Sequence, residues 1–416
     1  MLFMLDTRLP GMRRHIRSED DNPVLGDPAV RTVHIGAPAP SREAPPKMLR
    51  IQSALPDRYI SASADELTAM ISDARAALGE RVFILGHHYQ RDDVMRWADA
   101  RGDSYRLSVL AQQHPEADHI VFCGVHFMAE SADVLTADHQ RVILPDLNAG
   151  CSMADMADLD EVEEAWEALD RVIDVGRLVP ITYMNSSAAL KAFVGRHGGA
   201  VCTSTNARAV LDWALSRGDK VLFFPDQHLG RNTGLAMGYS HDDMRVWNPR
   251  LDLGGLSDVD VKQATFLLWK GHCSVHQRFR PEHVEAFRAE HPDGIVIAHP
   301  ECSHELCDLA DKVGSTDYII REVDAAPAGS VIAVATEIHL VQRLAAESPD
   351  KTVLSLDPLI CPCSTMFRID PPHLAWVLEN LVEGHVVNQI TVDAETAEAA
   401  RVALQRMLDI TEATKD

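Results

Sequence analysis

Short apolar segments alternate with polar turns and amphipathic stretches through most of the chain. Each segment is continuously apolar, which is typical of parallel β-strands covered by helices on both faces. The segments fall into three successive groups, and we interpret each group as one α/β unit of a repeated fold. The predicted strands are residues 82–85, 119–122 and 142–144, then 178–182, 200–202 and 221–224, then 295–298, 318–320 and 331–334, with a further strand at 352–355.

Helices are predicted at both ends of this region. Residues 64–78 carry apolar side chains near helical spacing, and the alanine-rich segment 394–408 has high helix propensity. Residues 1–50 differ, because they combine many prolines with scattered arginines and little periodicity. We interpret them as a flexible N-terminal extension without a site. A true start at Met48 is an equal alternative, because a more regular sequence begins there.

The grouping predicts three domains after the extension. We expect residues 60–160 to form the first domain, which the C-terminal segment 351–416 completes. Residues 161–262 should form the second domain and residues 263–350 the third. Each domain should be a Rossmann-like α/β/α layer, and ligands of such layers bind beyond the carboxyl ends of the strands.

Equivalent turns of the three groups carry similar polar residues. The first strand of each group ends in a polar cluster: Gly86-His87-His88-Tyr89, Tyr183-Met184-Asn185-Ser186 and His299-Pro300-Glu301. A hydroxyl residue follows each cluster: Ser104 lies 17 residues after His87, Ser204 lies 21 after Tyr183, and Thr316 lies 17 after His299. Each suits a helix start, where free N–H groups and a hydroxyl can bind a carboxylate or a phosphate.

The same spacing leads to three cysteines. Cys151 follows His87 by 64 residues, and Cys363 follows His299 by 64. Cys273 follows Tyr183 by 90 residues, and an insertion around 251–261 would account for the difference. Three such units about a pseudo-threefold axis would direct their loops at one central cavity.

Three converging thiolates indicate a metal site. A closed zinc site uses four ligands, often with Cys-x2-Cys spacing, and the sequence has neither that motif nor His-Glu-x-x-His. Widely separated cysteines suit an iron–sulfur cluster better, and a [4Fe–4S] cluster held by three cysteines leaves one iron open as a Lewis acid. Buried structural thiols are the alternative, and spacing alone leaves the two readings about equal.

Charge and cysteine usage narrow the class of partner. Lys and Arg number 39 against 62 Asp and Glu, so the net charge is −23, which argues against binding nucleic acid. The apolar runs are too short for a membrane span, so no membrane partner is expected. With no secretory signal in the sequence, we expect a cytoplasmic location in which the eight cysteines stay reduced.

Several long motifs resemble the quinolinate synthase (NadA) family. They are Gly86-His87-His88-Tyr89-Gln90, Gly102-Asp103-Ser104, Asn148 to Asp155, Tyr183 to Ser187, Cys202-Thr203-Ser204, Pro225 to Gly230, Gly271 to His276 and His299-Pro300-Glu301. The resemblance runs from about Phe83 to Met366. It implies three stacked α/β domains with pseudo-threefold symmetry around a central active-site cavity. It also implies a three-cysteine [4Fe–4S] cluster.

The resemblance further implies a transferase of NAD biosynthesis. Such an enzyme condenses iminoaspartate with dihydroxyacetone phosphate to quinolinate and releases phosphate and water. A transient contact with an enzyme that supplies iminoaspartate would fit this role.

The resemblance also suggests roles for individual residues. Glu301, Tyr89, Tyr183, His87 and His299 are the expected catalytic residues. The expected substrate-binding residues are His87, Ser104, Tyr183, Asn185, Ser204, His299, Glu301 and Thr316, and the expected metal ligands are Cys151, Cys273 and Cys363. Cys361 is the alternative third ligand, because it precedes Pro362 as the family motif requires. Cys363 keeps both the 64-residue offset and a methionine three positions later.

Two further expectations concern the protons of these residues. The pKa of Glu301 should be raised in a partly apolar cleft. His87 and His299 could donate to carboxylates or phosphate, or they could shuttle protons near neutral pH. Weaker assignments are His276 and His228 near the ligands, His126 and Met128 in the pocket wall, and Cys302 beside the pocket. Cys123, Cys202, Cys302 and Cys307 are expected to be structural thiols.

Three other classes of protein compete with this interpretation. A nicotinamide-dependent dehydrogenase should carry Gly-x-Gly-x-x-Gly after its first strand, and Gly86-His87-His88-Tyr89 is not such a loop. An iron–sulfur sensor would need the cluster but not the polar strand ends. A zinc protein would be colourless, whereas an iron–sulfur protein purified without oxygen would be brown.

Overall fold

The structure is a computed structural model that describes residues 52–359 and 362–414. The predicted N-terminal extension lies outside these residues. Within them, none of the helices combines the length and apolar character needed to cross a membrane.

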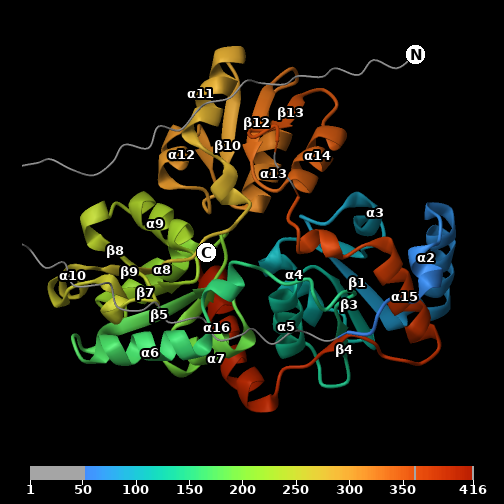
Figure 1. Cartoon of the computed structure of the whole chain (residues 1–416), viewed down its shortest axis with the longest axis horizontal. Coiled ribbons are helices and arrows are strands. Elements are labelled where there is room, and N and C mark those ends of the chain that lie inside the picture. Colours follow the sequence, from blue (N-terminus) through green and yellow to red (C-terminus); the bar gives the residue numbers. More distant parts are fainter. Residues whose placement is uncertain (1–51, 360–361, 415–416) are drawn as a thin grey trace, which may run out of the picture. The chain divides into compact units, whose positions relative to one another are not determined.

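Three separate sheets, each flanked by helices, confirm the predicted α/β class (Figure 1). Their strand orders are β2-β1-β3-β4-β14, β6-β5-β7-β9-β8 and β11-β10-β12-β13. The first four positions are equivalent in all three sheets: the second strand of each unit lies outside the first, and the third strand follows on its other side, next to β4, β9 or β13. All pairs are parallel except β14 with β4. The three sheets therefore share one strand order over these four positions.

The first sheet contains the earliest strands and one late addition. Its strands are β1 (Val82–His87), β2 (Ala100–Gly102), β3 (His119–Cys123), β4 (Arg141–Ile143) and β14 (Gln389–Ile390). The helices near it in the chain are α1 (Asp57–Ile60), α2 (Ala64–Leu78), α3 (Asp92–Met95), α4 (Ser104–Gln112), α5 (His126–Leu135) and α15 (Pro371–Val382). Helix α2 has the predicted bounds, because Ser63 and Glu66 form a capping box at its start and Gly79 ends it. Helix α15 packs against it.

The second sheet contains the insertion. Its strands are β5 (Leu178–Tyr183), β6 (Ala200–Cys202), β7 (Lys220–Phe224), β8 (Met244–Trp247) and β9 (Phe266–Trp269). Its helices are α6 (Leu159–Asp170), α7 (Ala188–Arg196), α8 (Ala207–Leu215), α9 (Gln227–Ala236) and α10 (Asp258–Gln263). Strand β9 takes the position of β4 in the first sheet. The inserted β8 and α10 therefore explain why Cys273 comes later in its group than Cys151 and Cys363.

The third sheet has four strands, and one of them corrects a prediction. Its strands are β10 (Ile295–Ala298), β11 (Lys312–Val313), β12 (Val331–Ala335) and β13 (Thr352–Ser355). Its helices are α11 (Pro281–Glu290), α12 (His304–Leu309), α13 (Thr316–Ala325) and α14 (Ile338–Glu347). The strand predicted at 318–320 was wrong, because this segment belongs to α13. Ser315 caps α13, and Ile319 and Val323 bury one helical face.

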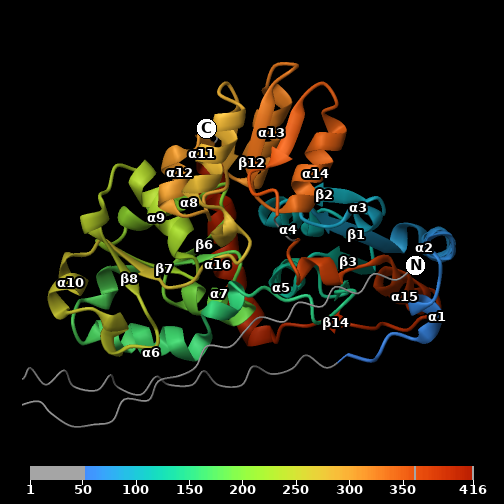
Figure 2. The ribbon, with the colours of Figure 1, turned by 45° about the horizontal axis from the view of Figure 1, so that its top comes forward.

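The C-terminal helix α16 (Ala394–Ala413) connects two of the units. It packs mainly on α7 and β6 and also touches α5, and its course beside α7 is visible in Figure 2. The domain boundaries stay a prediction, and two pairings bear on them. Strand β9 lies after residue 262 yet pairs in the second sheet, and β13 lies after residue 350 yet pairs in the third. The expected pseudo-threefold symmetry also stays a prediction.

Candidate functional site

One pocket gathers turns from the carboxyl ends of strands in all three sheets. Ligands of open α/β sheets bind at this end of the strands. All the residues to which the sequence analysis gave a catalytic, substrate or metal role line this pocket: His87, Tyr89, Ser104, Cys151, Tyr183, Asn185, Ser204, Cys273, His299, Glu301, Thr316 and Cys363. The structure therefore brings these residues together in one pocket, whereas their roles stay predictions.

Apolar side chains supply much of the remaining wall. They include Val125, Phe127, Met128, Met153 and Met366. Met128 therefore lies where the sequence analysis expected it. His126, His228 and Cys302 were also considered near the pocket, and none of them is among its described lining residues.

The three cysteines of the predicted metal site lie in equivalent turns. They follow β4, β9 and β13, the strands in the fourth position of their sheets. In each turn the cysteine carbonyl accepts a hydrogen bond from the N–H four residues later, at 3.0 Å for Cys151 and Cys273 and 2.9 Å for Cys363. A short 3-10 helix begins three residues after each cysteine: η2 (Ala154–Met156), η6 (His276–Arg278) and η7 (Met366–Arg368).

This repeated turn supports Cys363 as the third member of the set. Cys361 would stand two residues too early for the shared geometry, and it lies outside the described residues. Cys123, Cys202, Cys302 and Cys307 are free thiols that do not line the pocket.

The surroundings of the thiols fit a metal cluster. Burial raises the pKa of Cys151 to about 12, although N–H groups of Ala154 and Met153 hydrogen-bond its sulfur and lower it. Burial also raises the pKa of Cys273 well above its ordinary value, and the charges of Glu301, Cys151 and Cys363 add to this. Thiols with such raised pKa values lose their protons only when a bound cation compensates the charge, and N–H donors to sulfur are typical of iron–sulfur sites.

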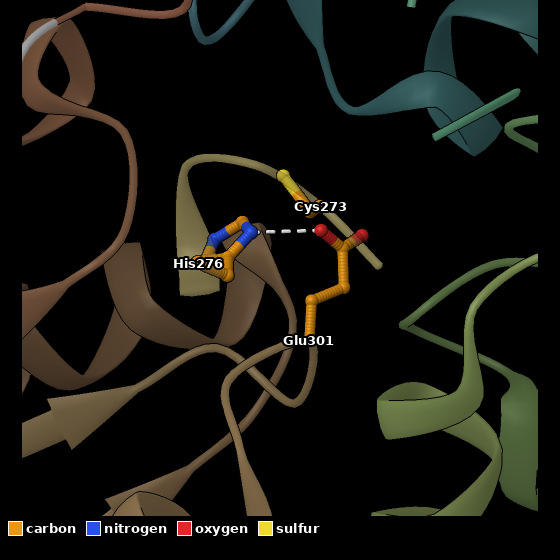
Figure 3. A group of neighbouring side chains, drawn as sticks. All are labelled: Cys273, His276 and Glu301. Carbon is orange, nitrogen blue, oxygen red and sulfur yellow. Dashed lines mark ion pairs between the residues drawn. The ribbon is translucent and has the colours of Figure 1, made fainter. Parts of the chain in front are cut away.

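Glu301 lies in the turn after β10, where residues from the second and third sheets meet. It is 3% exposed. The Tyr183 hydroxyl donates to its Oε1 at 2.6 Å, and His276 Nδ1 lies 2.7 Å from its Oε2. Figure 3 shows Cys273, His276 and Glu301 together, and among the described residues they form a group with ligand atoms within 4.8 Å of one another.

The expected direction of the Glu301 pKa was wrong. Burial raises the pKa of this carboxyl, but the electrostatic interactions with the His276 and His299 rings and the hydrogen bond from Tyr183 outweigh burial and lower it. Sequence reasoning considered only the apolar cleft and not these partners. Glu301 is therefore ionised at neutral pH. The same contact, together with burial, raises the pKa of Tyr183, which keeps its proton.

His87 and His299 repeat one local arrangement. The N–H of Tyr89 donates to His87 Nδ1 at 3.1 Å, and the N–H of Glu301 donates to His299 Nδ1 at 3.3 Å. Each ring is therefore neutral and carries its proton on Nε2. Burial lowers the pKa of both histidines to about 3, so the expectation that they titrate near neutral pH was wrong.

The three predicted hydroxyl residues occupy two kinds of position. Ser104 and Thr316 are the first residues of α4 and α13, and the caps are their predecessors, Asp103 and Ser315. Ser204 lies in the turn before α8, two residues ahead of its cap. Burial raises the pKa of Asp103, while hydrogen bonds from the Arg106 N–H and the Thr205 hydroxyl oppose this change.

Tyr89 belongs to a hydrogen-bond cluster with two threonines. Its hydroxyl lies 3.1 Å from Thr316 Oγ1 and 2.9 Å from Thr336 Oγ1. Burial and the charge of Glu301 raise its pKa, so Tyr89 also keeps its proton at neutral pH.

Sequence reasoning missed Glu337, which lines the pocket and is fully buried. Glu337 caps α14, its Oε1 accepts from the Cys363 N–H at 3.2 Å, and it also contacts His339 at 3.0 Å. It therefore ties the Cys363 turn to the third sheet. A signal existed, because Asp226 and Glu337 both stand two residues after the third strand of their units, and both cap the next helix.

Comparison with known proteins gives a consistent result. The family model described as quinolinate synthetase A protein matches residues 69–409. The chain is 58% identical over 359 residues to a quinolinate synthase of Corynebacterium glutamicum, with 86% of this chain and 91% of the relative covered. It is 57% identical over 355 residues to a quinolinate synthase of Herpetosiphon aurantiacus, with 85% and 94% covered.

Proposed function

Because the chain belongs to the quinolinate synthetase A family, we propose that it condenses iminoaspartate with dihydroxyacetone phosphate to quinolinate, releasing phosphate and water. The observation that carries this proposal is the single pocket in which three equivalent cysteine turns meet the polar strand ends. A cytoplasmic location would keep the thiols reduced, and a transient contact with a supplier of iminoaspartate would suit an unstable substrate.

Cys151, Cys273 and Cys363 would hold a [4Fe–4S] cluster. When bound there, the cluster supplies one iron without a protein ligand, which acts as a Lewis acid towards a substrate oxygen. The role of the protein is to bring three sulfurs together from three sheets and to direct backbone N–H groups at those of Cys151 and Cys273. Glu337 would hold the third turn in register.

Neutral donors would bind the anionic groups of the substrates. The Nε2–H groups of His87 and His299 can each donate to a carboxylate or a phosphate. The first N–H groups of α4 and α13, with the hydroxyls of Ser104 and Thr316, would add an anion site at each helix start. Ser204 and Asn185 would complete this set. Such donors explain how a protein of charge −23 can accept two anions.

Glu301 and the two tyrosines would manage the protons. As an ionised carboxylate, Glu301 can remove the proton needed to enolise the ketone phosphate. Tyr183 already donates to Glu301, and Tyr89 also keeps its proton. Both can donate to an oxygen that gains negative charge during the reaction.

An anaerobic assay for quinolinate, with iron and sulfide counted on the same sample, tests the proposal. We expect brown protein, four irons and four sulfides per chain, and quinolinate from iminoaspartate and dihydroxyacetone phosphate. A colourless zinc protein, or a full cluster without quinolinate formation, would refute it.

A further inference from the structure

Thr336 lies behind the pocket and joins two of its clusters. It directly follows β12 and is fully buried, and it is not among the described lining residues. Its Oγ1 lies 2.9 Å from Tyr89 Oη and 3.2 Å from His276 Nε2. These partners come from the turn after β1 and from the turn after β9.

The two contacts complete a continuous chain of polar contacts, in which the step from His276 to Glu301 is an ion pair. On one side, Tyr89 also meets Thr316 Oγ1 at 3.1 Å. On the other side, His276 Nδ1 lies 2.7 Å from Glu301, which accepts from Tyr183 at 2.6 Å. Thr336 is the link between these halves. Without its hydroxyl, the pair Thr316–Tyr89 and the trio His276–Glu301–Tyr183 would be separate.

The link needs a group with polar atoms that matches its two neighbours. A phenol can donate or accept a hydrogen bond, and a ring nitrogen of histidine can do either, depending on the tautomer. A threonine hydroxyl does both, and a valine of nearly the same shape does neither. Because the site is buried, water cannot replace the lost partner without rearrangement, and each unpaired group carries a desolvation penalty.

We propose that Thr336 is a positioning residue, which fixes the Tyr89 hydroxyl and the His276 ring in one chain of polar contacts that runs through Glu301 to Tyr183. The inference rests on the proposed function, since it concerns residues assigned there to quinolinate formation. Thr336 does not touch the pocket, so it acts through Tyr89 and His276 and should affect turnover more than substrate binding.

Three substitutions in the cluster-loaded enzyme separate the hydroxyl from the shape of the side chain. We expect Thr336→Val and Thr336→Ala to lower kcat about tenfold or more, the size expected when one buried hydrogen bond is lost. The KM for dihydroxyacetone phosphate and the iron content should stay close to wild type. Thr336→Ser should restore most of the lost turnover. Thr136→Val, a buried threonine away from the pocket, is the matched control and should keep the wild-type kcat.

The outcomes distinguish this inference from the proposed function. Wild-type turnover in Thr336→Val would overturn the role of Thr336, and so would a Thr336→Ser enzyme as slow as Thr336→Ala. If Thr336→Val does not fold, the Ser and Ala variants decide, because they differ by one oxygen. If the wild type makes no quinolinate, the proposed function fails, and a crystal structure of Thr336→Ala still tests the link. Tyr89 and His276 in unchanged positions there would refute it.

Discussion

The Tyr183 hydroxyl, at the end of β5, donates a 2.6 Å hydrogen bond to Glu301, in the turn after β10. The two residues belong to different sheets, so the contact depends on how the second and third units meet. It also determines their charges, because the contact helps to keep Glu301 ionised and Tyr183 protonated. A base and a neutral donor are thereby held side by side.

Glu301→Gln should keep its iron and lose at least about 100-fold in quinolinate formation. Glutamine is nearly isosteric and can still accept from Tyr183, but it cannot take up a proton. The measurement is the anaerobic turnover rate together with iron per chain. Glu305→Gln, an exposed carboxyl four residues later, is the control and should behave like wild type. Normal turnover of Glu301→Gln would remove Glu301 from the proton chemistry.

Substitution of each pocket cysteine should remove the cluster. Cys151→Ser, Cys273→Ser and Cys363→Ser are each expected to lose iron and activity, because each lies in one of three equivalent turns. Cys307→Ser should keep both, since Cys307 does not line the pocket. Iron and sulfide counts after anaerobic reconstitution give the answer. A full cluster in Cys363→Ser with loss in Cys361→Ser would transfer the third position to Cys361.

Strands could be predicted from the sequence where the local apolar pattern agrees with the position of the segment in the fold. Continuous apolar runs correctly located strands such as β1, β5 and β12, because buried parallel strands have this pattern at any position. The pattern failed at 318–320, where a β-branched pair lies on a capped helix. The true second strand of that unit, β11, has only two residues and leaves almost no periodic signal.

The sequence could predict those site residues that recur at equivalent positions of the three units. His87, Tyr183 and His299 stand at equivalent strand ends, so spacing could find them. Thr336 and Glu337 follow the third strand of their unit, and a polar residue before a helix there is equally an ordinary cap. The lowered pKa of Glu301 could not be foreseen either, because His276 and Tyr183 come from distant parts of the chain.

Glu337 should be needed for iron loading through its contact with Cys363. Glu337→Ala removes the acceptor for the Cys363 N–H, so we expect less iron per chain after reconstitution. Glu337→Gln keeps an acceptor oxygen and should retain most of the iron. The amplitude of cluster absorbance and the rate of cluster loss in air measure this effect. Equal iron in both variants would show that the contact does not hold the turn.

Lys191 makes stability depend on pH. It is fully buried on α7, its Nζ donates to the Ser186 carbonyl, and it faces Phe127 in the pocket wall at 5.5 Å. Burial lowers its pKa to about 7 from 10.5, although Glu130 opposes the change. Between these values the unfolded chain binds the proton and the folded chain does not, so the free energy of unfolding should increase with pH.

The comparison of wild type with Lys191→Met isolates this contribution. Well below pH 7, the wild type carries the full cost of a buried charge, and the variant does not. The wild type should therefore gain stability relative to the variant by up to about 1.4 kcal/mol per pH unit as pH rises from 7 towards 10. Anaerobic urea unfolding at pH 7, 8 and 9 measures the difference. The exposed Lys262→Met variant is the control, and its free energy of unfolding should differ from that of the wild type by the same amount at each pH. A difference for Lys191→Met that also does not change with pH would contradict the lowered pKa of Lys191.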